Sequence, residues 1–275
     1  MDVFRTDRIR NVVLLGHGGA GKTTLAEAMA YLAGMTNRLG RVEDGNTVSD
    51  YDKEEIKRHF SISTTLIPVP WDKVKINVLD PPGYFDFVGE VEEAISVADA
   101  AIIVVNCKAG IEPGTERAWE MCEKYNLPRL IFVTNMDDDH ASYRELVVKL
   151  EKKFGRKIAP FQLPIRENEK FVGFVNVAGR RFTNLSDYVE CEIPDYVQKN
   201  LTIARDALIE AVAETSEEYM ERYFLGEEFT QEEIAQALRE HVSEGNIVPV
   251  MMGSGVNAQG FAYLLQAIDK YFPSP

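Results

Sequence analysis

The sequence predicts an α/β fold with a mostly parallel, doubly wound sheet. Short apolar runs alternate with amphipathic segments over residues 11–154, and the same pattern returns over residues 247–271. Between residues 159 and 246 the pattern changes, which predicts an α+β inserted subdomain. We therefore expect a main domain made of residues 1–158 and 247–275, with the insert at 159–246.

Five runs of the main domain have the composition of buried strands. They contain continuous valine, isoleucine and leucine with little alternation, at residues 11–15, 75–79, 100–105, 129–133 and 247–252. Strands that are covered on both faces have this composition because neither side meets water. Residues 61–69 do alternate, which favours an edge strand that pairs antiparallel with the run at 75–79.

Amphipathic segments predict the helices that connect these strands. They lie at residues 23–33, 88–98, 116–125 and 142–154, and a final helix is expected at 260–271. The alternation of strand and helix is typical of a parallel sheet with helices on both faces. The last four residues, Phe272-Pro-Ser-Pro, have the composition of a linker, so we expect the chain to be the front piece of a longer protein.

The insert has its own pattern. Residues 171–177 alternate at period two and lead into Ala178-Gly179, which predicts a hairpin turn. Apolar residues recur at helical spacing from Val197 to Tyr219. Thr230 and Glu233 predict a capping box at the start of another helix.

Composition and charge exclude several classes of protein. The 275 residues are 45% hydrophobic and 27% charged, as in an ordinary globular protein. With 30 basic and 44 acidic residues the net charge is −14, which argues against a chain that holds DNA or RNA by its own basic field, though a local contact stays open. No run reaches the roughly 18 apolar residues that span a bilayer, and the first ten residues are charged where a signal peptide is apolar. Cys107, Cys122 and Cys191 lack metal-binding spacing, so we expect a reduced, cytoplasmic protein without a membrane segment.

A glycine-rich loop follows the first predicted strand. Residues 16–23 read GHGGAGKT, which fits G-x-x-x-x-G-K-[ST] between a strand and a helix. In such a loop backbone N–H groups close around phosphate oxygens, Lys22 reaches the outer phosphates and Thr23 offers a hydroxyl to Mg²⁺. The motif in this context predicts a nucleotide phosphate site rather than a packing turn.

A second motif follows the run at 75–79. Asp80-Pro81-Pro82-Gly83 fits D-x-x-G, in which the carboxylate holds the metal through water and the glycine N–H meets the terminal phosphate. Alone this motif indicates only a turn. After a phosphate loop it indicates a P-loop GTPase.

The motifs together resemble the elongation factor G family, the ribosomal translocases. The matching segments are GHGGAGKTT at 16–24, DPPGYFDFVGEV at 80–91, GIEPGT at 110–115, FQLPI at 161–165, Gly253-Ser254, and LLQAIDKYFPSP at 264–275. The resemblance covers essentially the whole chain and corresponds to that family's nucleotide-binding domain with its inserted subdomain. It implies a GTP-binding domain at 1–158 and 247–275, and the family's following domains are not in the sequence.

The resemblance also implies the roles of individual residues. GTP or GDP would bind with Mg²⁺, and Thr23, Ser61 and Asp80 would hold the metal. Lys22, Gly83 and Tyr84 would serve hydrolysis. The nucleotide would contact the phosphate loop (Gly16, His17, Gly18, Gly19, Ala20, Gly21, Lys22, Thr23 and Thr24), the second switch (Asp80 and Gly83) and two base-reading segments (Thr134, Asn135 and Asp137; Gly253, Ser254 and Gly255).

Five departures from the family pattern change what we expect. Gly18 and Gly19 stand where the family has valine and aspartate, which makes the loop more flexible. Ser61 replaces threonine, and His59 replaces a glycine, which suggests a different backbone path. Tyr84 stands where the family has the histidine that orients the attacking water, so we expect slow hydrolysis.

The fifth departure concerns the base, where Thr134-Asn135 replaces Asn-Lys and the lysine stem is missing. We prefer Asp137 as the residue that reads guanine, because the strand at 129–133 sets the register, but reading residues 135–138 as N-K-x-D would select Asp138. The segment at 40–60 is expected to be mobile without the γ-phosphate.

The insert carries most of the negative charge. Residues 205–244 contain 12 acidic and 3 basic residues, or −9 of the total −14. Two interpretations stay open: a solvated face of two helices, or, as the family suggests, a surface that meets a basic face of the ribosomal stalk protein.

The expected function is that of a GTPase that drives ribosomal translocation. In the full-length factor the partners would be the ribosomal RNA and the stalk protein, and we expect a monomer that binds neither DNA nor membrane. The alternatives are a specialised paralogue for ribosome recycling or antibiotic protection, and a slow-hydrolysing factor that acts by occupying the ribosome with GTP bound. A P-loop kinase or ATPase is disfavoured by Asp137 and Ser254.

Overall fold

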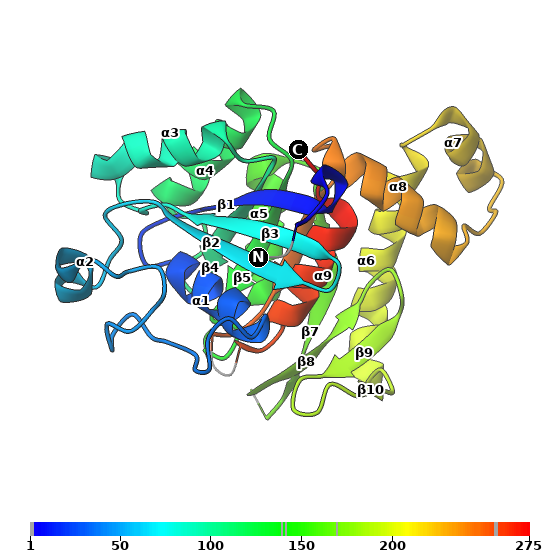
Figure 1. The fold of residues 1–275 in the computed structure, drawn as a ribbon. Coiled ribbons are helices and arrows are strands. Elements are labelled where there is room, and N and C mark those ends of the chain that lie inside the picture. The colour runs from blue at the N-terminus through cyan, green and yellow to red at the C-terminus, as the bar shows by residue number, and fades with distance from the viewer. Residues whose placement is uncertain (1–2, 139, 141, 169, 256–257) are drawn as a thin grey trace.

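The central sheet of the computed structural model is mostly parallel. The structure describes residues 3–138, 140, 142–168, 170–255 and 258–275. Within these residues the strand order is β2-β3-β1-β4-β5-β11-β6, and only β2 runs antiparallel to its neighbour (Figure 1). The strands are β1 (Ile9–Leu15), β2 (Thr65–Trp71), β3 (Val74–Asp80), β4 (Ala100–Asn106), β5 (Arg129–Thr134), β6 (Ile158–Pro160) and β11 (Val248–Met252). The predicted fold class is confirmed.

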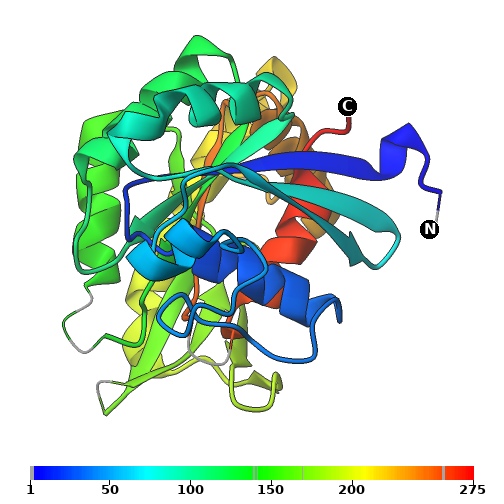
Figure 2. The same ribbon diagram turned by 60° about the vertical axis from the view of Figure 1, so that its left-hand side comes forward.

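Helices cover both faces of this sheet, as Figure 2 shows. One face carries α1 (Lys22–Leu32) and α9 (Phe261–Tyr271), and the other carries α3 (Val88–Ser96), α4 (Pro113–Lys124) and α5 (Tyr143–Phe154). Val12 and Leu14 of β1 belong to the first core, whereas Val13 and Leu15 belong to the second. Because alternate residues of a strand point to opposite faces, β1 is buried on both sides, as its continuous apolar sequence predicts.

The edge of the sheet differs in detail from the prediction. The antiparallel partner of β3 begins at Thr65, so Ser61 lies outside the strand, in the segment that leads to it. A short helix, α2 (Lys53–Arg58), precedes that segment and begins at a capping box of Asp52 and Glu55. The same sequence signal predicts the start of α8, so α2 could have been predicted in the same way.

The inserted residues form a second, antiparallel sheet with three helices beside it. The strand order is β10-β9-β8-β7, made of β7 (Gln162–Glu167), β8 (Lys170–Asn176), β9 (Arg181–Asn184) and β10 (Glu190–Cys191). The expected hairpin turn joins β8 to β9, and Asn176 Oδ1 accepts a hydrogen bond from Gly179 N at 2.6 Å. The helices are α6 (Asp195–Ala213), α7 (Glu217–Phe224) and α8 (Gln231–Ser243).

Two of the helices of the insert begin at capping residues. Thr230 and Glu233 form the predicted capping box of α8. The helical pattern from Val197 to Tyr219 is broken into two helices, because Ser216 caps α7 by accepting a hydrogen bond from Tyr219 N. No helix among the described residues combines the length and the apolar character that a membrane span requires.

Candidate functional site

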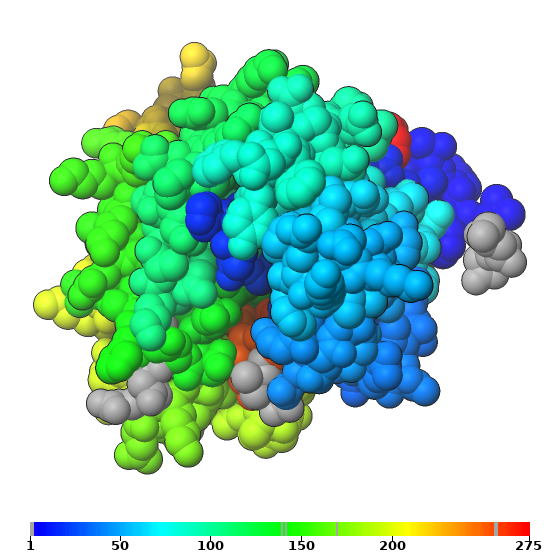
Figure 3. Space-filling model, turned by 90° about the vertical axis from the view of Figure 1, so that its left-hand side faces the viewer, coloured from blue at the N-terminus to red at the C-terminus, as the bar shows by residue number. Residues whose placement is uncertain are grey.

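The phosphate loop connects β1 to α1 and lies at the bottom of a hollow. Figure 3 shows this loop in dark blue between the light blue segment that carries α2 and the cyan and green segments opposite. Gly16, Gly19 and Gly21 all have positive φ, and Gly21, at 99°, is the N-cap of α1. Lys22 is buried, and its Nζ donates to Gly16 O at 3.2 Å and His17 O at 3.0 Å. The loop is therefore already curled around the lysine ammonium.

The segment after β3 packs onto this loop at Gly83. A β-carbon at Gly83 would clash with Lys22 Nζ and would lie 2.9 Å from Gly18 Cα. Only a residue without a side chain allows such a close approach, so the glycine of D-x-x-G is required here for steric reasons. The two motifs predicted from the sequence thus lie side by side.

The expected metal-binding residues also come together. Thr23 Oγ1 and Ser61 Oγ lie 3.2 Å apart, and Asp80 is fully buried beside them. Two residues that the sequence analysis missed complete this polar cluster. Ser49 Oγ donates to Asp80 Oδ2 at 2.6 Å, and Ser61 Oγ donates to Asp50 Oδ1 at 2.7 Å.

Two carboxylate oxygens of this cluster have no hydrogen-bond partner among the residues that the structure describes. They are Asp80 Oδ1 and Asp50 Oδ2, and both are buried. Buried polar atoms are almost always satisfied, so these two oxygens are suited to ligating a cation. Hydroxyl and carboxylate oxygens are the ligands that Mg²⁺ prefers, so the donor set present here suits that metal.

Burial shifts the pKa values of the charged groups. Desolvation raises the pKa of Asp80 to about 6, although the Ser49 hydrogen bond and the Lys22 charge act in the opposite direction. Desolvation also raises the pKa of Asp50, and it lowers the pKa of Lys22. Each shift disfavours the charged form of its group. A bound phosphate would therefore stabilise the Lys22 ammonium, and a bound metal ion would stabilise the two carboxylates.

Tyr84 lies over the phosphate loop. Its ring meets the Phe60 ring edge-on, with centroids 4.9 Å apart, and a β-carbon at Gly18 would lie 3.1 Å from Cε1 and Cζ of the tyrosine. The side chain is 46% exposed. The packing partner of the ring is thus Phe60, from the segment that carries α2.

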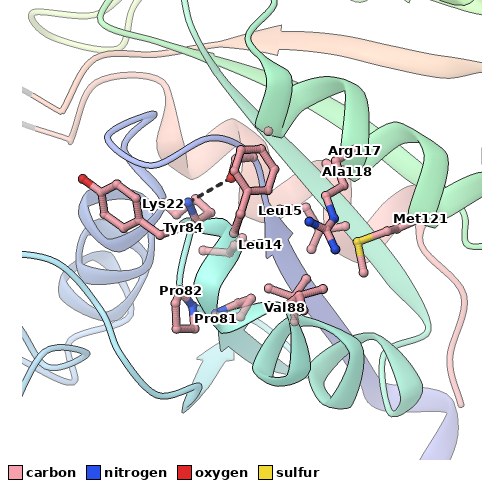
Figure 4. Close-up of a pocket in the computed structure, with 15 residues that line it drawn as sticks. Leu14, Leu15, Lys22, Pro81, Pro82, Tyr84, Val88, Arg117, Ala118 and Met121 are labelled. Atoms are coloured by element: carbon pink, nitrogen blue, oxygen red, sulfur yellow. Dashed lines mark hydrogen bonds between the residues drawn. The ribbon is translucent and has the colours of Figure 1, made fainter.

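Beside Lys22 a cavity extends between the second switch and α4. Figure 4 shows Val88 below this cavity and Arg117 and Met121 of α4 on its far side, while Tyr84 points away from it. The Arg117 guanidinium lies 5.4 Å from the centroid of the Phe85 ring. His17 borders the same region, where its Nδ1 accepts a hydrogen bond from Gly114 N at 3.3 Å.

The two segments that are expected to read the base meet at the ends of β5 and β11. Ser254 is fully buried, and its Oγ donates to Asp137 Oδ1. Asp138 instead pairs with Lys108 Nζ at 3.2 Å and accepts a hydrogen bond from His140 N at 2.9 Å. Asp137 therefore contacts the loop at 253–255, whereas the Asp138 carboxylate is engaged by Lys108 and His140. This arrangement favours Asp137 as the residue that reads the base.

Further contacts connect the base side to the phosphate loop. Thr134 Oγ1 donates to Ala20 O at 2.8 Å. A β-carbon at Gly255 would lie 2.9 Å from Thr24 Cγ2. Asn135 has a φ of 57°, a left-handed conformation that asparagine tolerates better than most residues. The predicted site residues thus surround one region of the molecule.

A buried carboxylate of α1 holds the segment at 40–60. Glu27 Oε1 accepts from Gly40 N at 2.9 Å, and Glu27 Oε2 accepts from Val48 N at 2.7 Å. His59 in this segment has a φ of 55°, a conformation that favours glycine, which is the residue the family has there. The mobility of the segment without the γ-phosphate stays a prediction.

These features define a P-loop nucleotide-binding domain of the GTPase class. The phosphate loop lies between β1 and α1, the glycine of D-x-x-G packs on that loop, and the Asp137 carboxylate lies beside the loop that follows β11. Comparisons with known proteins agree. The Elongation factor Tu GTP binding domain family matches residues 7–274. The chain belongs to this family.

Within the family its relatives are elongation factors G. The chain is 36% identical over 274 residues to elongation factor G of Thermotoga petrophila, covering 98% of this chain and 39% of that protein. It is 32% identical to elongation factor G 2 of Syntrophus aciditrophicus, covering 98% of this chain and 41% of that protein. A crystal structure of a Thermus thermophilus protein superimposes with a TM-score of 0.92 at 38% identity, covering 98% of this chain and 41% of that one. The chain thus spans about two fifths of the length of the curated relatives it matches, and the predicted resemblance to the elongation factor G family is confirmed.

Proposed function

We propose that this domain binds GTP and GDP with Mg²⁺ and hydrolyses GTP as part of a translation factor that acts on the ribosome. The observation that carries the proposal is the packing of Gly83 against Gly18 and Lys22, which brings the two phosphate-contacting motifs together. The elongation factor G relatives support the translational role.

In this proposal the base is read by Asp137. A carboxylate accepts both N–H groups on the edge of guanine, and adenine offers no such pair. Ser254 holds one oxygen of Asp137, and Thr134 ties the segment to the phosphate loop. Asn135, Gly253 and Gly255 complete the base side, and the loop residues Gly16 to Thr24 surround the phosphates.

Mg²⁺ would be held by Thr23 and Ser61, with Asp80 acting through water. When bound, the metal neutralises charge on the phosphates. The buried, unpartnered Asp80 Oδ1 supports this assignment, and Asp50 gives the same region a second carboxylate. Lys22 stabilises charge on the outer phosphates, and the Gly83 N–H donates to the terminal phosphate.

The attacking water would be oriented by Tyr84. Its hydroxyl can donate and accept a hydrogen bond, but a phenol, unlike an imidazole, has no positively charged form to offer. Hydrolysis is therefore expected to be slow. This residue also favours the second candidate, a factor that acts by occupying the ribosome with GTP bound. Translocation, recycling and antibiotic protection remain alternatives for the whole protein.

The insert, residues 159–246, would contact the ribosomal stalk through its acidic helices. Phe224 and Leu225 at the end of α7 are 78% and 76% exposed, and Glu221 and Glu227 flank them in the sequence. An apolar pair within an acidic surface suits a partner that is apolar at the centre and basic at the rim. In this proposal the protein is a cytoplasmic monomer that also contacts ribosomal RNA.

Nucleotide competition and phosphate release test the proposal. GTP and GDP should displace a fluorescent GDP from the domain, and ATP or XTP should not. The full-length factor should release phosphate slowly and only with ribosomes. Equal competition by ATP would contradict guanine recognition, and rapid release without ribosomes would contradict the translational role. Ribosome binding with GTP but no release would support the occupancy alternative.

A further inference from the structure

A basic residue of the inserted sheet reaches the base-reading segment. Arg166 is the next-to-last residue of β7, and its Nη2 donates to Met136 O at 2.6 Å and to Asp138 O at 3.3 Å. These two carbonyl groups flank Asp137 in the sequence. One guanidinium nitrogen therefore bridges the carbonyl groups of the residues before and after the one that is expected to read guanine.

The local geometry of β7 directs this side chain. The pairing of β7 with β8 shifts register beside Arg166, because Ile165 pairs with Gly173 while Arg166 pairs with Phe171, which leaves Val172 of β8 as the extra residue. A bulge bends and twists the strand pair locally, and Arg166 lies directly opposite this irregularity. The Tyr196 hydroxyl of α6 donates to Arg166 O at 3.0 Å, which ties the backbone at this position to the helix. Arg166 thus connects the inserted sheet to the segment that is expected to read the base.

Two anchors hold the base-reading segment from different directions. Met136 is fully buried and its N–H donates to Gly253 O at 3.4 Å, while Ser254 holds the Asp137 carboxylate. Arg166 supplies a further anchor, and hydrogen bonds from a charged donor are the stronger kind. Without it the carbonyls at 136 and 138 would lose the group that fixes their direction.

We propose that Arg166 is a positioning residue that orients Asp137 for guanine recognition, so that guanine affinity depends on the inserted sheet. This inference rests on the proposed function. It goes beyond the phosphate and base motifs, because Arg166 lies outside both of them and in a different sheet.

Base discrimination in the whole chain tests this role. IDP lacks the 2-amino group of guanine, so the ratio of IDP to GDP dissociation constants reports on the Asp137 carboxylate. The probe is a fluorescent GDP, displaced by GDP or IDP. Arg166→Met should weaken GDP about tenfold and IDP much less, because a hydrogen bond to a charged group is worth roughly that factor. Lys170→Met, an exposed cation on the neighbouring strand β8, is the matched control and should change neither constant.

The conservative variant separates positioning from folding. Arg166→Lys keeps one charged donor, so it should restore part of the discrimination that Arg166→Met loses. A purely structural role would weaken GDP and IDP equally, and that result overturns the inference. Unchanged discrimination in both Arg166 variants, with tight GDP binding by the unaltered chain, also overturns it while leaving the proposed function intact. Failure of the unaltered chain to bind GDP overturns both.

Discussion

The Tyr84 ring packs on the phosphate loop at Gly18, where a β-carbon would lie 3.1 Å from two ring atoms. Gly18 and Tyr84 are both departures from the pattern of the family, and the structure relates them. The small residue leaves room for the large ring, which Phe60 then holds from the other side.

Gly18→Val should therefore destabilise the domain by about 2 kcal/mol, because extra methyl groups overpack the contact with Tyr84. Most of this loss should disappear in the double variant with Tyr84→Ala, since that change removes the ring. Urea unfolding of the two single variants and the double variant measures the coupling. Gly89→Ala is the control, because a β-carbon at Gly89 meets nothing within 4 Å. Additive effects of the two changes would show that ring and loop are independent.

Tyr84→His in the full-length factor should accelerate ribosome-stimulated hydrolysis, by roughly 10²- to 10⁴-fold if the imidazole reaches the water. Single-turnover phosphate release measures this rate. Tyr84→Phe removes only the hydroxyl, so it should slow hydrolysis further if that hydroxyl orients the water. An unaltered factor as fast as its histidine variant would mean that another group, or the tyrosine itself, already positions the water well.

Asp137→Asn should shift nucleotide preference from guanine to xanthine, because an amide can donate to the xanthine oxygen where the carboxylate accepts from guanine. Competition by XDP and GDP against a fluorescent nucleotide measures the shift. Asp138→Asn is the paired control and should leave the preference unchanged, since Asp138 is engaged by Lys108 and His140. The opposite outcome would assign the base to Asp138.

Asp80 should give the free domain a characteristic pH dependence. Its pKa is raised from the ordinary 3.8 to about 6, so between these values the folded state holds a proton that the unfolded state has lost. The free energy of unfolding should then fall as the pH rises from about 4 to about 6. The side chain introduced by Asp80→Asn does not titrate, so this variant serves as the reference. Above about pH 6 the unaltered domain should have lost about 3 kcal/mol of unfolding free energy relative to that variant.

Urea unfolding at pH 4.5, 5.5 and 7, without nucleotide or Mg²⁺, provides this comparison. If the free energy of unfolding changed with pH in the same way in both proteins, the pKa of Asp80 would not be raised in the folded state. Mg²⁺ together with GDP should favour the carboxylate and remove the difference.

Glu27→Gln should loosen the segment at 40–60. The carboxylate accepts from two backbone N–H groups, whereas the amide turns one acceptor into a donor, which costs about 1–2 kcal/mol. Limited proteolysis should cut the variant faster within this segment, and a non-hydrolysable GTP analogue should slow the cutting. Glu93→Gln, on the exposed side of α3, is the control. Equal cutting rates in variant and control would show that Glu27 does not anchor the segment.

Much of the fold could be predicted because its signals are local. The buried strands are continuous apolar runs, and the start of α8 depends on Thr230 and Glu233, three residues apart. β6 could not be found in this way, since three residues show no periodicity and their place beside β11 depends on a strand far along the chain. The division of the chain at residue 158, just where β6 begins, remains a proposal.

The candidate site shows the same contrast. The residues around Lys22 and Gly83 belong to contiguous motifs whose spacing reflects how a backbone closes around phosphate. Ser49, Asp50 and Arg166 belong to no such motif, and only tertiary packing brings them to Asp80, Ser61 and the base segment. A segment with little periodicity gives no sign of which polar residue will be buried.

The strand order also has a consequence for how the chain folds during synthesis. β11 lies between β5 and β6, yet it begins only at Val248, after the whole second sheet and its helices. Until that strand has left the ribosome, β5 has an open edge with unpaired backbone groups, and β6 has no place to dock. The main sheet therefore cannot be completed until the insert has been synthesised, and long-range pairing of this kind is slow and prone to aggregation. An early, independent collapse of residues 162–243 would shorten the distance that β11 must search, so the insert would serve as a guide for closing the sheet.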